Sequence, residues 1–202
     1  PMPDFRFSDL AGKRIAVAAD VPTPWLTFQD DLQRVGIDPA SLIRVEDRPM
    51  AENAARLEAG EIDVMHVFEP YASQAVADGY GHIWHRFAVR GDVAFTTFYA
   101  TRAYLDDHPA VCEKLVTGIG HALTRMYAMP IAELTEKVSP YFPGLDPAVL
   151  AAAIDGYRAA ELWARETSLP PTAIVRLKAA LLYGGFLDRD MPYDAIAREV
   201  PG

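Results

Sequence analysis

Apolar residues in the first half of the chain alternate between short continuous runs and stretches with helical spacing. Residues 14–19 form an apolar run that ends at Asp20 and two prolines, which is typical of a buried strand leading into a loop. From Trp25 to Val35 the apolar residues recur every three or four positions, which predicts a helix, and Gly36 ends it. The pattern therefore predicts a strand followed by a helix.

The same order continues along the chain. Residues 41–45 predict a second strand, 50–59 a second helix and 63–68 a third strand. Strands and helices that alternate with short links favour parallel strands joined by right-handed crossovers. Two further stretches, 83–89 and 93–101, are rich in β-branched and aromatic residues and predict extended structure.

The second half of the chain has the spacing of helices. Pro109 marks one helix start, and the following apolar stripe reaches Met126. Asp146-Pro147 repeats this start signal. Thr172 is expected to cap the last helix, and Gly184-Gly185 to end it.

The change of pattern places a boundary near residues 102–108. It divides the chain into an α/β lobe at 8–101 and a mainly helical segment at 102–202. The predicted fold class is therefore α/β, a parallel-sheet lobe followed by a helical C-terminal half.

Composition and charge exclude several classes of protein. Half of the 202 residues are hydrophobic, which excludes a disordered chain. The net charge is −9, from 19 Lys and Arg against 28 Asp and Glu, so a nucleic-acid or anionic-lipid partner is not expected. With Cys112 as the single cysteine, no intramolecular disulfide can form. No apolar run approaches the ~18 residues of a membrane span, and no signal peptide is visible at the start.

Common catalytic and nucleotide-binding motifs are absent from the sequence, and two loops carry the more informative side chains. The first follows the first predicted strand, where ligands of open α/β sheets gather and where a helix N-terminus offers free N–H groups. Thr23 either caps that helix or donates to a ligand. Trp25 either stacks on a planar ring or packs in the core, and packing is favoured.

The second loop follows the third predicted strand. Pro70 fits the first turn of a helix, so Glu69 either caps that helix or accepts from an amine or ring N–H of a ligand, with Tyr71 beside it. His66 is interpreted first as a core histidine and second as a ligand contact. Thr96, between Phe95 and Thr97, is a candidate for a further wall of the site.

Two other side-chain groups suggest chemistry only weakly. His82 and His85 are three residues apart, but on a strand they face opposite ways, so a metal site there is not favoured. Cys112 lies early in a predicted helix and is interpreted as a packed side chain rather than a nucleophile.

An ordered series of segments resembles the NMT1/THI5-like and SsuA-like substrate-binding proteins of ABC importers. The segments are DLAGKRIAVAAD, GIDPASLIRVEDRPMAENAARLEAGEIDVMHVFEPYASQAV and TTFYATRAYLDDHPAVCEKLVTGIGHAL. The resemblance covers residues 8–130 well and the helical remainder loosely. It implies a type II periplasmic-binding-protein fold, in which two α/β lobes hold a ligand between them.

The resemblance also implies a function. Such a protein binds a small solute without altering it, delivers it to an ABC permease in the membrane, works outside the cytoplasm and needs no cofactor or metal. Family ligands include sulfonates, taurine, nitrate, bicarbonate, thiamine pyrimidine precursors and riboflavin. An acidic and aromatic wall with Glu69, Tyr71, His66 and Trp25 suits an amine-bearing heterocycle such as an aminopyrimidine.

One feature departs from the family pattern. The strand that opens the second lobe in the family begins near residue 8 here, so the chain is a fragment, a cleaved product or a reduced relative. The segment 102–202 would then pack on the first lobe. The alternatives are an enzyme on the same fold, such as a pyrimidine synthase, and a sensory ligand-binding domain. The synthases carry a CCCFC motif that is absent here.

Overall fold

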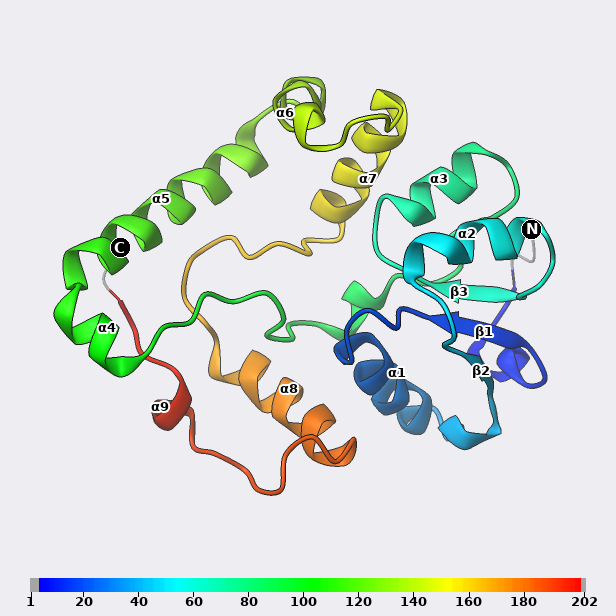
Figure 1. Ribbon diagram of the computed structural model, residues 1–202, viewed down its shortest axis with the longest axis horizontal. Coiled ribbons are helices and arrows are strands. Elements are labelled where there is room, and N and C mark those ends of the chain that lie inside the picture. The colour runs from blue at the N-terminus through cyan, green and yellow to red at the C-terminus, as the bar shows by residue number, and fades with distance from the viewer. Residues whose placement is uncertain (1–3, 201–202) are drawn as a thin grey trace.

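Three parallel strands form one small sheet in the N-terminal half of the protein. The computed structural model describes residues 4–200 (Figure 1). Strands β1 (Arg14–Val17), β2 (Ile43–Val45) and β3 (Val64–His66) lie in the order β2-β1-β3. Ile15 pairs with Arg44 on one side and with Val64 on the other. The predicted parallel sheet is confirmed, with strands slightly shorter than the sequence pattern indicated.

Each strand leads into a helix. These helices are α1 (Thr23–Arg34), α2 (Met50–Glu58) and α3 (Tyr71–Ala77), so α1 begins two residues earlier than predicted. Because apolar side chains from β1 and α1 face each other, they form the main core of the lobe. Its buried members are Leu10, Ile15, Val17, Phe28 and Leu32.

The second half is helical, as the sequence predicted. Its helices are α4 (Arg102–Asp107), α5 (Pro109–Ala128), α6 (Ile131–Val138), α7 (Pro147–Ala159), α8 (Pro171–Tyr183) and α9 (Tyr193–Ile196). Short 3-10 helices also occur: η1 (Phe7–Leu10), η2 (Pro39–Ser41) and η3 (Phe87–Arg90) lie in the first half of the chain, and η4 (Ser139–Tyr141) lies in the second. The Asp146 carboxylate accepts a hydrogen bond of 2.7 Å from the Ala148 N–H, which confirms the predicted start of α7.

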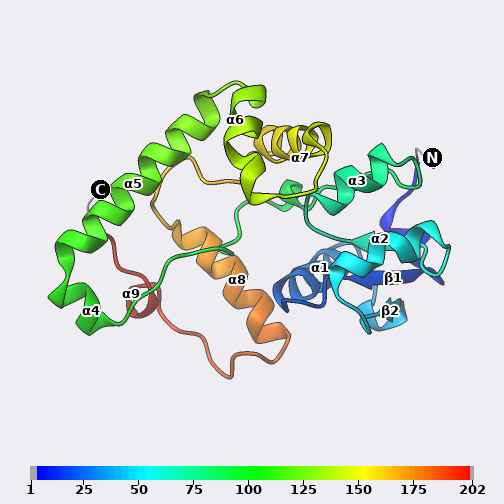
Figure 2. The same cartoon turned by 45° about the horizontal axis from the view of Figure 1, so that its top comes forward.

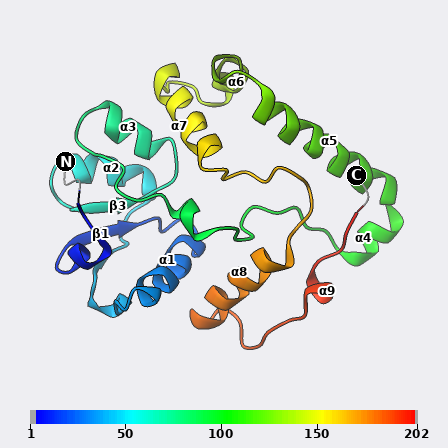
Figure 3. The same cartoon turned by 180° about the vertical axis from the view of Figure 1, so that it is seen from behind.

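The helical half returns to the sheet lobe at two places. Helix α8 packs against α1, and α7 packs against α3. Figures 2 and 3 show both contacts, with α4 and α5 on the side of the molecule away from the sheet. None of the helices within residues 4–200 combines the length and apolar character that crossing a membrane requires.

Three sequence predictions were wrong in detail. Residues 83–89 and 93–101 form no strand: η3 occupies part of the first stretch, and the second is irregular. Extended structure becomes a strand only beside a partner strand. The Ala94 backbone N–H instead donates to the Ala173 carbonyl of α8 at 3.2 Å. Thr172 does not cap α8, because Pro170 occupies the cap position and places Thr172 inside the first turn.

The contact of α8 with α1 depends on a glycine. A Cβ atom at Gly184 would lie 2.2 Å from Cδ2 of Leu26, which is buried. Gly184→Ala therefore forces α8 away from α1, and we expect a loss of about 1–3 kcal/mol of unfolding free energy in urea titrations. Gly118→Ala is the matched control, because its Cβ meets nothing within 4 Å. It should stabilise α5 by about 0.5–1 kcal/mol. Equal effects from both substitutions would contradict the close approach.

Candidate functional site

The carboxyl ends of the three strands meet at one edge of the sheet. Because the strands are parallel, the helices α1, α2 and α3 that follow them all begin at this edge (Figure 1). Helix N-termini carry unsatisfied N–H groups and the positive end of the helix dipole. Open α/β sheets bind ligands at this edge, which makes it the candidate site.

Two of these helix N-termini are capped by carboxylates. The Met50 N–H at the start of α2 donates to the Asp20 carboxylate at 3.0 Å. The Ser73 N–H in the first turn of α3 donates to Oε2 of Glu69 at 2.9 Å. Glu69 thus has the capping role that the sequence offered as one of its two interpretations. A ligand contact by its other oxygen stays a prediction.

Among residues 4–200, no side chain caps the N-terminus of α1. Pro22 occupies the cap position, and Thr23 is the first helical residue, so the capping interpretation of Thr23 was wrong. The Thr23 carbonyl accepts from the Thr27 hydroxyl at 2.9 Å, whereas its own hydroxyl makes no hydrogen bond to the described residues. The Thr23 hydroxyl is therefore free to contact a ligand at this edge.

Trp25 packs in the lobe. Its ring lies edge-on to Phe28, with ring centroids 6.1 Å apart, and the Arg44 guanidinium lies 4.3 Å above its centroid. The contacts with Phe28 and with Arg44 both agree with the favoured packing interpretation of Trp25. Burial lowers the pKa of the Arg44 guanidinium, against the opposite effect of Glu46.

The turn after β3 contacts the helical half. The Glu69 N–H donates to the hydroxyl oxygen of Tyr157 on α7 at 2.8 Å. Burial raises the pKa of that hydroxyl. No local pattern in the sequence signals this contact, because Glu69 and Tyr157 lie 88 positions apart in the chain. Tyr71, the first residue of α3, is half-buried beside this turn.

His66 belongs to an aromatic cluster beneath the edge. Its ring lies 4.3 Å from the Phe87 ring and 5.7 Å from the Phe28 ring, measured between centroids. Nδ1 is buried and has no hydrogen-bond partner in the described part of the chain. Burial lowers the pKa of His66 to about 3, with smaller contributions from Arg90 and His85. The ring is therefore neutral at physiological pH.

Thr96 and the other candidates lie outside this cluster of contacts. Thr96 is exposed, although its neighbour Phe95 reaches the Phe68 ring at 5.8 Å. His85 packs against Phe7, and His82 is exposed. Within residues 4–200, no group of three or more His, Cys, Asp or Glu side chains is placed to hold a metal ion.

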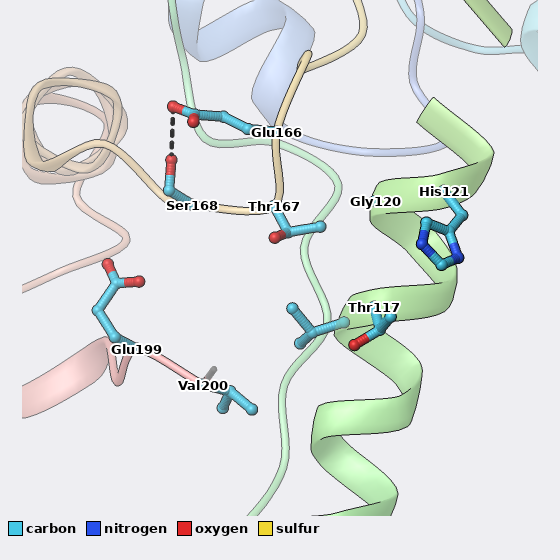
Figure 4. Close-up of a pocket in the computed structure, with 9 residues that line it drawn as sticks. Thr117, Gly120, His121, Glu166, Thr167, Ser168, Glu199 and Val200 are labelled. Carbon is cyan, nitrogen blue, oxygen red and sulfur yellow. Dashed lines mark hydrogen bonds between the residues drawn. The ribbon is translucent and has the colours of Figure 1, made fainter. Parts of the chain in front are cut away.

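A separate hollow lies in the helical half. It has a volume of about 510 Å³ and lies between α5 and two extended segments, 166–168 and 199–200 (Figure 4). The Ser168 hydroxyl donates to the Glu166 carboxylate at 2.9 Å. The polar side chains that line this hollow are exposed and converge on no common point. The sheet edge therefore remains the candidate site.

Comparisons with known proteins point to one family. A model of the NMT1-like family matches residues 6–138. "Putative binding protein YtlA" of Bacillus subtilis (strain 168) is 24% identical over 197 residues, which cover 96% of this chain and 59% of that protein.

Solved structures share the fold. The alkanesulfonate-binding protein SsuA from Xanthomonas axonopodis pv. citri, bound to MOPS, matches with a TM-score of 0.65 and 20% identity, over 91% of this chain and 60% of that one. The ligand binding component of an ABC-type import system from Staphylococcus aureus, with zinc bound, matches with a TM-score of 0.66 and 14% identity, over 96% and 65%. These likenesses confirm the predicted periplasmic-binding-protein-like fold. The chain spans about three fifths of the length of these relatives.

The neutral state of His66 makes stability depend on pH. Below the ordinary pKa of about 6.5, the unfolded chain takes up a proton at His66 while the folded chain does so only near pH 3. The unfolding free energy should therefore fall by about 1 kcal/mol between pH 7 and 5.5. Urea titrations at both pH values should show a smaller fall for His66→Leu. The exposed His82→Gln control should keep the full fall, and an unchanged fall in His66→Leu would contradict the assignment.

Proposed function

The chain belongs to the NMT1-like family, and from this premise we propose that it is the ligand-binding lobe of a solute-binding protein that serves an ABC importer. The observation that carries the proposal is the shared edge where three parallel strands end and three helices begin. Two similar proteins support it, since YtlA is described as a putative binding protein and SsuA as an alkanesulfonate-binding protein.

The proposed mechanism is binding without chemistry. A solute at the sheet edge would contact the uncapped N-terminus of α1 and the Thr23 hydroxyl on one side. On the other side it would meet the turn at Glu69 and Tyr71. Release to a permease in the membrane would follow, and the protein would work in the periplasm or, associated with the membrane, on its extracytoplasmic side. The known relatives that match are binding proteins, which favours this role over an enzyme.

Two solute classes remain candidates. An aminopyrimidine would use the acidic and aromatic wall around Glu69, but one oxygen of this carboxylate already accepts from Ser73. A sulfonate, taurine or nitrate would use N–H and hydroxyl donors, which the start of α1 offers. The contacts of Glu69 and Trp25 therefore shift the balance towards solutes with an anionic group.

Helix α5 supports the proposal that the helical half packs on a further lobe of the kind these relatives have. No residue of α5 is buried, although an apolar stripe runs along it. Val111 is 53% exposed and Leu115 is 46% exposed. An amphipathic helix is held mainly by burial of its apolar face, so such a stripe indicates a surface that another polypeptide covers.

Solute binding can be tested by thermal shift on the full chain, with aminopyrimidines, riboflavin, taurine, alkylsulfonates and nitrate. A solute at 100 times its Kd adds about 2.7 kcal/mol and should raise the Tm by roughly 5–10 °C. Thr23→Ala should reduce the shift without lowering the Tm of the free protein, because its hydroxyl makes no cap bond. Thr117→Ala, an exposed threonine of α5, is the control. No shift with any of these solutes would contradict the proposed receptor.

The exposed stripe of α5 should make the isolated chain self-associate. Sedimentation velocity between about 1 and 100 μM should show a rising mean mass, because apolar surface left uncovered drives association. Leu115→Lys should suppress it. Val175→Lys, at a residue of α8 that is 60% exposed, should not. A monomer throughout this concentration range would count against the proposed lobe contact.

A further inference from the structure

A groove lined by two opposite charges lies between η3 and α7. Its volume is about 460 Å³. Arg86, directly before η3, and Asp155, on α7, are its charged side chains, and the remaining side chains are small and apolar, among them Ala88, Ala159 and Ala160. The lining thus combines one positive and one negative side chain with small apolar ones.

A glycine allows Arg86 to lie against α7. A Cβ atom at Gly156 would be 3.3 Å from Nη1 of Arg86, a contact tighter than side chains normally make. The guanidinium therefore lies over the bare backbone of the helix. Within residues 4–200, neither Arg86 nor Asp155 takes part in an ion pair or a side-chain hydrogen bond. Both charges are thus available to a molecule in the groove.

The groove adjoins the candidate site. Tyr157, the residue after Gly156, accepts the hydrogen bond from the Glu69 N–H at the turn after β3. Burial raises the pKa of the Tyr157 hydroxyl, and the nearby Arg86 guanidinium opposes that effect. The Arg86 charge therefore acts on the Tyr157 hydroxyl that contacts this turn.

We propose that this groove binds a short zwitterion, with its carboxylate or sulfonate on Arg86 and its ammonium on Asp155. The planar guanidinium matches a carboxylate or sulfonate with paired N–H donors, and a carboxylate accepts from an ammonium. The negative charge of Asp155 would repel a ligand that is only an anion. The positive charge of Arg86 would likewise repel a ligand that is only an amine. The small apolar side chains accommodate a short methylene spacer. This inference rests on the proposed solute-binding function and names the solute class.

Calorimetric titration of the full chain tests the inference. The probes are β-alanine and 4-aminobutyrate, which carry carboxylates, and taurine, which carries a sulfonate. Propionate, ethanesulfonate and ethylamine are the singly charged comparisons. At least one zwitterion should bind at least tenfold more tightly than its singly charged counterparts, and the two acid groups distinguish a carboxylate ligand from a sulfonate ligand.

Substitutions then locate the site. Arg86→Gln and Asp155→Asn should each weaken zwitterion binding about tenfold or more, whereas Arg86→Lys, which keeps the charge, should weaken it less. Lys114→Gln and Glu113→Gln remove equal charges from exposed positions on α5 and should change nothing. Because Arg86 and Asp155 are exposed, circular dichroism and the Tm of each free variant should match the wild type.

The outcomes separate this inference from the proposed function. Failure of all three zwitterions to bind would overturn the inference, and the receptor proposal would stand or fall on the wider panel of solutes. Zwitterion binding that Arg86→Gln and Asp155→Asn leave unchanged would overturn it while upholding solute binding. Loss of binding in both variants, with the α5 controls unaffected, would locate zwitterion binding in the groove beside the sheet edge.

Discussion

Parallel pairing of β1 with both of its neighbours is the constraint on which the rest of this structure depends. It brings three strand ends and three helix N-termini to one edge, and it leaves each of those helices with N–H groups that need partners. Asp20 and Glu69 satisfy two of the helices from within the chain. The third, α1, keeps its first turn uncapped. The same pairing thus both creates the demand for hydrogen-bond acceptors at this edge and leaves one place where a solute could supply them.

The helical half completes this edge through a few specific contacts. Tyr157 fixes the turn after β3 by accepting from the Glu69 N–H, and α8 lies against α1 because Gly184 presents no side chain to Leu26. Arg86 reaches α7 in a similar way, over Gly156. Small residues therefore set how closely the helices approach the sheet lobe. The close approach of the helix backbones at Gly184 and Gly156 therefore helps to position the charged and aromatic residues at the edge, in addition to the contacts that those residues make themselves.

The sequence predicted what depends on local pattern. The periodicity of apolar residues was enough for the parallel sheet and its two crossover helices, α1 and α2, and the Asp146-Pro147 signal was enough for the start of α7. It failed where the outcome depends on a distant partner. Residues 93–101 have strand-forming side chains but no strand beside them. The cap of α8 is a different, local error, because α8 begins at Pro171 with Pro170 at the cap position and so leaves Thr172 inside the first turn. For the candidate site, local pattern suggested Thr23, Glu69 and His66, whose contact with a ligand stays a prediction. It could not find Tyr157 or Arg86, whose neighbours are supplied by the fold.

The contact of α8 with α1 also determines when the surface of α1 becomes buried during synthesis of the chain. The Gln33 side chain donates to the Tyr183 hydroxyl, across 150 positions of sequence. At the usual 5–20 residues per second, roughly 8–30 s separate the emergence of α1 from the arrival of the helix that covers it. The sheet and its own helices can form in that interval, because their contacts are local. The outer flank of α1 stays bare throughout, and a chaperone that binds nascent apolar surface would find it there.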